Sequence, residues 1–128
     1  MIDTTAEPEI HRRHDKLQAW FRAEACIDAL DDLMAHFCSD FSMVGIAGRR
    51  LDRHAVQALF AGTHGARAGL KITIEAVQAL EVPSPLAVLR YREGHAIDGG
   101  EPAWRDSRAV LRQEQGRWCW LALHEVAV

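Results

Sequence analysis

The chain contains little that would anchor it in a membrane or cross-link it. Residues 1–5 have neither the basic start nor the apolar core of a signal peptide. No apolar run approaches the length of a membrane span. Only three cysteines are present, an odd number without CxxC spacing, namely Cys26, Cys38 and Cys119. We therefore expect reduced thiols in a cytoplasmic protein, with neither a disulfide framework nor a zinc site.

A dominant charge sign is also missing. The formal net charge of the chain is only -3, and acidic and basic residues are mixed along its length. This excludes a basic stripe for nucleic acid and a polybasic anchor for an anionic membrane. With 128 residues and no repeat or linker, the sequence predicts one domain over residues 1–128.

The first third of the chain has helical periodicity. One stripe of side chains begins after Pro8 and recurs at spacings of three and four residues, formed by Ile10, His14, Leu17 and Phe21. Such a stripe predicts an amphipathic helix. A second stripe over residues 27–37 predicts either another helix or a continuation of the first, bent near residues 25–26. Asp52 is a suitable N-cap for a third helix.

Strand patterns surround and follow this third helix. Residues 41–46 predict a short strand, and Ala47-Gly48 allows a turn into residues 49–51. Four longer strands are predicted from about residues 70, 86, 104 and 118, joined by short turns such as Gln115-Gly116. Helices followed by an antiparallel meander indicate an α+β domain whose sheet curls around the helices.

Several local signatures accompany this order of elements. They are residues 29–37 (ALDDLMAHF), Asp40-Phe41, Gly48, residues 116–118 (GRW) and residues 121–124 (LALH). Together they resemble the nuclear transport factor 2-like superfamily, especially its small bacterial SnoaL-like members, over about residues 10–126. The resemblance implies a cystatin-like cone, in which a strongly curved antiparallel sheet wraps around N-terminal helices and leaves a partly apolar pocket. It also implies dimerisation through the sheet in many members.

The resemblance does not extend to one well-defined activity of that superfamily. Its steroid isomerases carry a carboxylate on the first strand, whereas residues 43–46 contain no acid. Those isomerases also carry a tyrosine on the first helix, whereas the only tyrosine of this chain is Tyr91. Because members range from isomerases and cyclases to pure scaffolds, the fold alone does not choose a function.

The last two strands predict one face of the pocket. With Gln115-Gly116 as a two-residue turn, the cross-strand pairs on one face are Ser107 with His124, Ala109 with Ala122, and Leu111 with Trp120. We assign this face to the pocket, with Arg105 one step further along its strand. A turn one residue longer would exchange the two faces.

Two histidines are candidate general bases in this pocket, His124 from the last strand and His14 from the first helix. Arg105 is expected to anchor an anionic or carbonyl group beside Ser107. The remaining ligand-binding residues are predicted to be Leu17, Phe21, Phe60, Tyr91 and Trp120. In the alternative interpretation, both histidines are hydrogen-bonded structural residues and Arg105 pairs with a neighbouring acid.

Motifs for other chemistries are missing. His11, His14 and Asp15 share a helix face, and His36 lies two residues from Cys38, but neither group matches a strong zinc pattern such as HExxH. No GxSxG nucleophile elbow is present. We expect neither a metal nor a cofactor.

Apolar residues on both faces of the last two strands predict that a second copy covers the outer face, giving a homodimer. Neither nucleic acid nor a membrane is expected as a partner. The sequence thus predicts a domain that binds a small hydrophobic or weakly anionic molecule, with no established reaction. Two alternatives remain, namely an acid–base isomerase, cyclase or dehydratase acting on a small hydrophobic carbonyl compound, and a dimerisation scaffold.

Overall fold

A computed structural model describes residues 2–128 of the chain. Its helical elements are α1 (Glu7–Phe21), the short 3-10 helix η1 (Ile27–Ala29), α2 (Leu30–Met34) and α3 (Arg53–Ala61). Its strands are β1 (Phe37–Val44), β2 (Arg50–Asp52), β3 (Leu70–Leu80), β4 (Leu86–Ile97), β5 (Ala103–Glu114) and β6 (Arg117–Ala127). The predicted order of helices and strands is therefore confirmed.

The helices begin and end close to where the sequence predicts. In α1, the stripe residues Ile10, His14 and Leu17 are buried, as an amphipathic helix requires. The Asp52 side chain accepts a hydrogen bond of 2.8 Å from the Ala55 amide, which confirms it as the N-cap of α3. The second stripe differs from the prediction, because helix α2 ends at Met34 and Phe37 already belongs to β1.

The strands form one six-stranded sheet in the order β2-β1-β6-β5-β4-β3. Strands β3 to β6 make the predicted antiparallel meander. Strand β1, however, pairs in parallel with β6, so the sheet is mixed rather than wholly antiparallel. This pairing joins segments far apart in the sequence, and local patterns do not reveal it.

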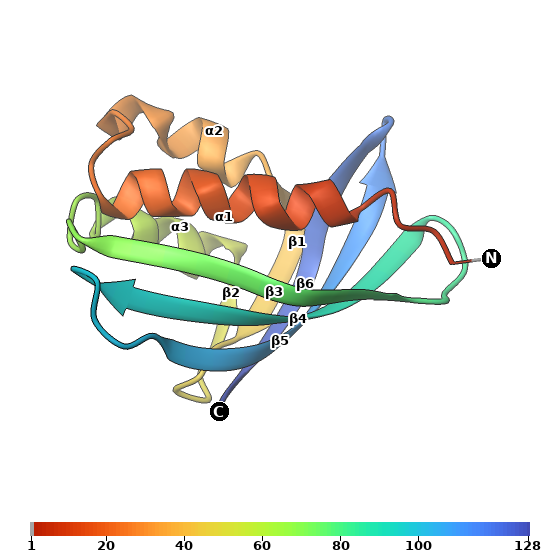
Figure 1. Cartoon of the computed structure of the whole chain (residues 1–128). Coiled ribbons are helices and arrows are strands. Elements are labelled where there is room, and N and C mark those ends of the chain that lie inside the picture. The colour runs from red at the N-terminus through yellow and green to blue at the C-terminus, as the bar shows by residue number, and fades with distance from the viewer. Residues whose placement is uncertain (1) are drawn as a thin grey trace.

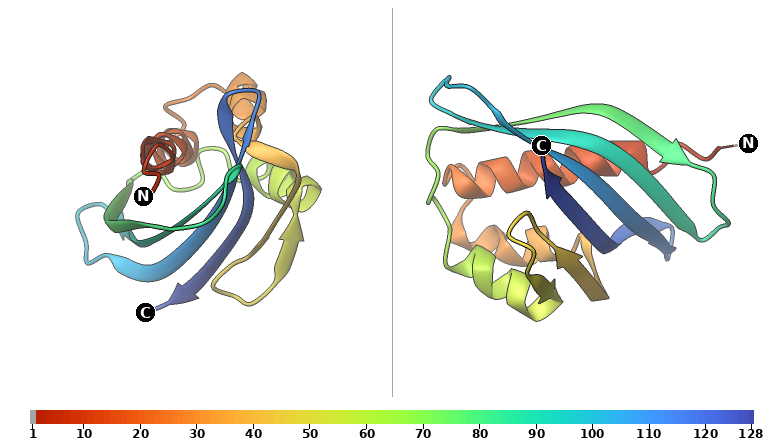
Figure 2. Two further views of the ribbon diagram at one scale, coloured as in Figure 1. Left: turned by 90° about the vertical axis from the view of Figure 1, so that its right-hand side faces the viewer. Right: turned by 90° about the horizontal axis from the view of Figure 1, so that it is seen from below.

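The sheet is strongly bent and all the helices lie on its inner side (Figure 1). Helix α1 packs against β3, while α3 packs against β1 and β2. Seen from two further directions, the sheet curls around α1, and no described helix covers its outer face (Figure 2). The α+β cone predicted from the sequence is present. No helix within residues 2–128 has both the length and the apolar character needed to cross a membrane.

The predicted register of β5 and β6 is wrong beyond the end of the hairpin. Gln115 and Gly116 do form a two-residue turn with positive φ angles, and Leu111 pairs with Trp120 as expected. A bulge then adds Leu121 to β6, so that Val110 pairs with Ala122. Since one extra residue exchanges the faces of all that follows, Ser107 pairs with Glu125 instead of His124.

The expectation of three reduced cysteines is also wrong. Cys38 in β1 and Cys119 in β6 form a disulfide across 81 residues of sequence, with their Cα atoms 5.2 Å apart. Cys26 is a free, exposed thiol. The disulfide follows from the parallel pairing of β1 with β6, which the spacing of the cysteines does not show.

Candidate functional site

The inner face of the sheet carries a group of polar side chains in an otherwise apolar core. We call this group the inner polar cluster; it consists of Arg13, His14, Tyr91, Glu93, His95, Arg105, Ser107 and Glu125. All but Arg105 are buried. Residues 91, 93 and 95 alternate along β4, and residues 105 and 107 along β5, so period-two geometry points them all inward. Burying so many ionisable groups is costly unless each finds a partner.

Glu93 is the centre of this cluster and accepts from two histidines. His14 Nε2 lies 2.9 Å from its Oε1, and His95 Nε2 lies 2.5 Å from its Oε2. Although burial alone would raise it, these hydrogen bonds and the positive charge of His14 hold the pKa of Glu93 well below its usual range. Glu93 is therefore held in the ionised form inside the cone at neutral pH.

The tautomer of His95 follows from its partners. Arg67 NH1 donates to His95 Nδ1 at 2.9 Å, and a guanidinium can only donate. His95 Nε2 therefore carries the hydrogen that is donated to Glu93. His95 thus links the half-buried Arg67 to the buried carboxylate.

His14 bonds to protein groups through both of its ring nitrogens. Its Nδ1 donates to the Ile10 carbonyl at 2.6 Å, while Nε2 lies close to both Glu93 and Arg13 NH1, the latter at 3.1 Å. Because Nδ1 already donates to Ile10, the hydrogen bond from Nε2 to Glu93 requires a hydrogen on each ring nitrogen. His14 thus lies in the interior, as predicted, but between two protein partners.

Glu125 is the second buried carboxyl of the cluster, and its environment differs from that of Glu93. Glu125 forms an ion pair with Arg105, whose NH1 lies 3.6 Å from Oε2 of Glu125. This distance is too long for a good hydrogen bond. Burial, and secondly the negative charge of Glu93, raise the pKa of Glu125. Glu125 is the carboxyl of the cluster that is held less firmly in the ionised form.

Three buried polar atoms of the cluster have no hydrogen-bond partner, namely Arg13 Nε, Tyr91 Oη and Ser107 Oγ. Tyr91 and Ser107 are direct neighbours across β4 and β5. Against the larger effect of burial, the Ser107 hydroxyl acts on Tyr91 as a hydrogen-bonding side chain that lowers its pKa, so the two hydroxyls lie close together although their geometry does not complete a hydrogen bond. Burial above all, and the nearby Glu93 carboxylate, raise the pKa of Tyr91 well above its usual value, so its hydroxyl keeps its proton and can donate. Buried polar atoms are normally paired, so these three mark a place where water or a ligand group belongs.

Two arginines lie at the boundary of the cluster with solvent, namely Arg105, which belongs to the cluster, and Arg67, which does not. Arg67 follows α3, and its pKa is lowered, first by burial and then by the charge of Arg105. Both side chains are only half-buried. Two converging guanidinium groups at the boundary of a buried polar site favour an anion there.

The apolar residues predicted to line the pocket differ in how deeply they are buried. Leu17, Phe60 and Trp120 are buried in the core, and Phe21 packs against it while partly exposed. Trp120 and Phe37 sandwich the Arg13 guanidinium at 4.8 Å and 5.2 Å from their ring centres. These side chains form the packed walls of the cluster.

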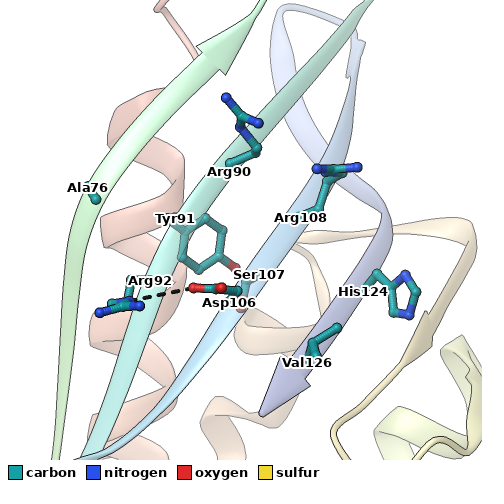
Figure 3. Close-up of a pocket in the computed structure, with 9 residues that line it drawn as sticks. All are labelled: Ala76, Arg90, Tyr91, Arg92, Asp106, Ser107, Arg108, His124 and Val126. Carbon is teal, nitrogen blue, oxygen red and sulfur yellow. Dashed lines mark ion pairs between the residues drawn. The ribbon is translucent and has the colours of Figure 1, made fainter. Parts of the chain in front are cut away.

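His124 is not part of this arrangement, because the bulge turns it to the outer face, where it is exposed. There it borders a hollow of about 690 Å³ (Figure 3). Arg90, Arg108 and His124 are direct neighbours across three strands in this hollow, and Asp106 pairs with Arg92 at 3.5 Å. Ser107 also belongs to the lining of this hollow, whereas Arg105 does not, and the cross-strand partner of Ser107 is Glu125. The expected pairing of Ser107 with His124 is therefore wrong.

Sequence reasoning missed Glu93, His95, Glu125 and Arg13. A signal for two of them was present, because Glu93 and His95 follow the predicted pocket residue Tyr91 at spacings of two and four on one strand. Glu125 could not be found, since only the bulge brings it inside. Arg13 lies beside the helix stripe and is buried by stacking on aromatic rings.

One group of possible metal ligands exists among the described residues. Atoms of Cys38, Glu114 and Cys119 lie within 4.8 Å of one another. Both sulfurs are joined in the disulfide, so neither is a thiolate in this structure. The group therefore offers one carboxylate and no free sulfur ligand.

Comparison with known proteins places this geometry in a family. No family model and no curated protein matches the chain. A solved NTF2-like (nuclear transport factor 2-like) protein of unknown function from Pseudomonas aeruginosa is 37% identical, with 95% of this chain and 97% of that chain covered and a TM-score of 0.90.

More distant structures share the fold. An NTF2-like protein of unknown function from Pseudomonas putida is 15% identical, with 100% and 90% of the two chains covered and a TM-score of 0.75. A putative calcium/calmodulin-dependent protein kinase II association domain from Thiobacillus denitrificans is 23% identical, with 91% and 92% covered and a TM-score of 0.70. The narrower SnoaL-like assignment stays a prediction. The chain, with its bent sheet and polar interior, belongs to the nuclear transport factor 2-like family.

Proposed function

We propose that the chain binds a small, weakly anionic molecule at the inner polar cluster. The observation that carries this proposal is the set of three buried atoms without partners, Arg13 Nε, Tyr91 Oη and Ser107 Oγ. A guest with a carbonyl or hydroxyl oxygen would satisfy them, and each satisfied buried group is worth about 1–3 kcal/mol. Because side chains pack this interior, the guest has to be small.

Arg67 and Arg105 are the groups proposed to orient the anionic end of this guest. Both lie at the boundary of the cluster, and their charges act on one another. Partly buried apolar side chains from four elements pack against the same core, namely Phe21, Met43, Leu51, Ile72 and Ile74. They favour a guest that combines an anionic group with a small apolar part.

A second candidate function is acid–base catalysis on a small carbonyl compound, by an isomerase, cyclase or dehydratase. It is favoured because the pKa values of Glu93 and Glu125 are displaced in opposite directions. Such a pair can divide the roles of permanent charge and proton carrier. In this proposal Glu125 carries the proton, and neither His124 on the outer face nor the doubly partnered His14 does.

Calorimetric titration with small carboxylates, such as acetate, butyrate and benzoate, tests the binding function. Arg105→Gln should weaken binding by about tenfold or more, because a charge-assisted hydrogen bond is lost. Arg108→Gln is the matched control, since Arg108 lies on the same strand but on the outer face. Equal affinities for both variants would contradict the proposal.

Deuterium exchange tests the catalytic candidate. If Glu125 moves protons, the chain should exchange the α-hydrogens of a small bound ketone with solvent deuterium, and Glu125→Gln should stop this exchange while binding persists. If the unmodified chain binds the ketone but does not exchange its α-hydrogens, the catalytic function is rejected and the binding function stands.

We further propose a homodimer through the outer sheet face and a cytoplasmic location. The dimer is supported by the lack of any described helix over that face and by the half-buried Val88, Val110 and Ala122. The Cys38–Cys119 disulfide weighs against this location, because disulfides persist mainly in oxidising compartments. Cell fractionation tests the location: the chain is expected in the cytoplasmic fraction, and its recovery from a periplasmic or secreted fraction would contradict this proposal.

A further inference from the structure

Three side chains that can bind a metal meet outside the inner polar cluster, at the end of the hairpin formed by β5 and β6. Cys38 comes from β1, Glu114 from the end of β5 and Cys119 from β6, and their ligand atoms lie within 4.8 Å of one another. Sulfur and carboxylate oxygen are both ligands that zinc takes in proteins. The spacing of the cysteines does not predict this group, because only the pairing of β1 with β6 forms it.

Glu114 has one carboxylate oxygen fixed by the protein and one directed at sulfur. Its Oε2 accepts from Arg112 Nε at 2.9 Å, and Arg112 NH2 lies 2.7 Å from the same oxygen. Its Oε1 lies 3.3 Å from Cys119 Sγ and has no other partner among residues 2–128. A disulfide sulfur carries no hydrogen, so Oε1 gains no hydrogen bond while Cys119 is bonded to Cys38. Oε1 is thus an acceptor whose protein neighbour cannot donate to it.

The contact between this oxygen and sulfur has nearly the length that a shared zinc ion needs. With Zn–S bonds of about 2.3 Å and Zn–O bonds of about 2.1 Å, tetrahedral angles place the two atoms about 3.6 Å apart. The observed 3.3 Å between Glu114 Oε1 and Cys119 Sγ is close to that value. Only the two sulfurs have to move apart, and they can do so once the bond between them is broken.

The backbone beside Cys38 allows this movement. Strand β1 is in register with β6 at Phe37 and again from Ser42, but the register shifts between these two positions. Residues 37 to 42 of β1 correspond there to residues 120 to 122 of β6. Cys38 therefore lies in a segment of β1 that the ladder does not hold to β6 at a fixed spacing.

The charges and the exposure of the group suit a divalent cation. Two thiolates, Glu114 and the nearby Asp40 are all negative, and Arg112, which binds both carboxylates, is positive. A divalent cation would therefore offset most of the excess negative charge. Cys38 is only 2% exposed, whereas the Glu114 side chain is 49% exposed. An ion thus has a path from solvent past Glu114, and water can complete its coordination.

We propose that Cys38, Cys119 and Glu114 form a zinc site in the reduced chain, so that the disulfide and the metal exclude one another. A dithiol reductant breaks the S–S bond by supplying two electrons and two protons; it becomes a disulfide itself and leaves two thiols on the chain. Each thiol gives its proton to solvent as its sulfur binds Zn²⁺. Glu114 Oε1 is the third ligand and water is the fourth. The redox state of the surroundings then decides whether the chain carries the metal.

Cobalt(II) is the probe for this site, because it takes tetrahedral sites as zinc does and its bonds to thiolates absorb in the near ultraviolet. The experiment uses the full chain with Cys26→Ser, which removes the exposed free thiol. The chain is reduced with dithiothreitol, which is then removed without air. Cobalt should give saturable thiolate absorption with the reduced chain, zinc should abolish this absorption, and the oxidised chain should show none. A reduced chain without this absorption would overturn the proposal.

A pair of glutamate variants tests the third ligand. Glu114→Gln should weaken cobalt binding to the reduced chain by about tenfold or more, as expected for the loss of a ligand. Glu101→Gln, at another exposed glutamate, should leave the affinity unchanged. Equal affinities of the two variants would overturn the site with Glu114 as a ligand.

Thermal unfolding gives a readout that holds even if reduction loosens the fold. Because a ligand stabilises the state that binds it, zinc should raise the Tm of the reduced Cys26→Ser chain by several degrees, or restore its circular dichroism where reduction has diminished it. Zinc should leave the oxidised chain unchanged. No effect of zinc on the reduced chain, or an equal effect on both forms, would overturn the proposal.

Discussion

Glu93 and Glu125 lie in the same buried cluster, yet their surroundings move their pKa values in opposite directions. Two imidazoles donate to Glu93, whereas Glu125 has one distant arginine. A lowered pKa means that the folded state binds the proton less tightly than the unfolded state, and a raised pKa means the reverse. The two residues therefore contribute to stability with opposite dependence on pH.

For Glu93 the stabilising contribution is present above the unfolded pKa of about 4.3 and is lost as the pH falls towards the lower folded value. We expect Glu93→Gln to reduce the free energy of unfolding at pH 7 by about 3–5 kcal/mol, because a buried charge network is broken. The loss should shrink below about pH 4. Urea denaturation at both pH values measures it, with the exposed Glu101→Gln as control. A loss independent of pH would contradict the ion-pair account.

For Glu125 the sign is reversed, since its folded pKa is raised. Its ionisation opposes folding, so stability should fall as the pH rises above about 4.3. We expect Glu125→Gln to have a higher Tm than the unmodified chain at pH 7, and the difference to vanish near pH 4. Calorimetric scans across this range measure it. If Glu125→Gln instead had a lower Tm than the unmodified chain at pH 7 but not at pH 4, the favourable ion pair with Arg105 would outweigh the cost of burying the charge.

At this scale the sequence predicted part of the site. Tyr91, Ser107, Arg105 and His14 all face the interior, as the strand and helix periods indicate. Glu93 has the same period as Tyr91 but was not predicted, because charged side chains are rarely buried without partners and those partners come from α1. Pairing across 79 residues of sequence is not visible in a local pattern.

At the scale of single elements, one inserted residue decides which side chains reach the interior. The turn at Gln115-Gly116 was predicted from its residues, and the structure has it. The bulge at Leu121 has no comparable sequence signal, because Leu121 fits either face of a buried strand. It exchanges His124 for Glu125 on the inner face. The fold was thus predictable to the level of strands, and the register only up to the bulge.

The disulfide between β1 and β6 fastens the only parallel pair of the described sheet. A cross-link over 81 residues should stabilise the fold by about 4 kcal/mol through the entropy of the unfolded chain. We expect Cys38→Ser to lower the free energy of unfolding by about this amount in the absence of reductant, and dithiothreitol to abolish the difference. Cys26→Ser, at the exposed free thiol, is the control. No difference between the two variants would mean that the bond does not form in solution.

At the scale of the whole molecule, the outer sheet face decides how the chain associates. Val110 lies beside the basic neighbours Arg90 and Arg108 on this face, so Val110→Arg adds a like charge to it. If the predicted homodimer forms there, this variant should sediment as a monomer at micromolar concentration while the unmodified chain sediments as a dimer. Leu59→Arg, on the exposed side of α3, should leave the dimer intact. A monomeric unmodified chain would reject the dimer.

The binding of a small anion inside the cone is tested most directly at Tyr91, the only tyrosine in the chain. Chain labelled with carbon-13 only at the tyrosine Cζ gives one signal, which comes from the middle of the inner polar cluster. Titration with benzoate should shift this signal to saturation, and the shift should be lost in Arg105→Gln but kept in Arg108→Gln. A tyrosine signal that does not move, while benzoate binds elsewhere on the chain, would contradict a binding site in the interior.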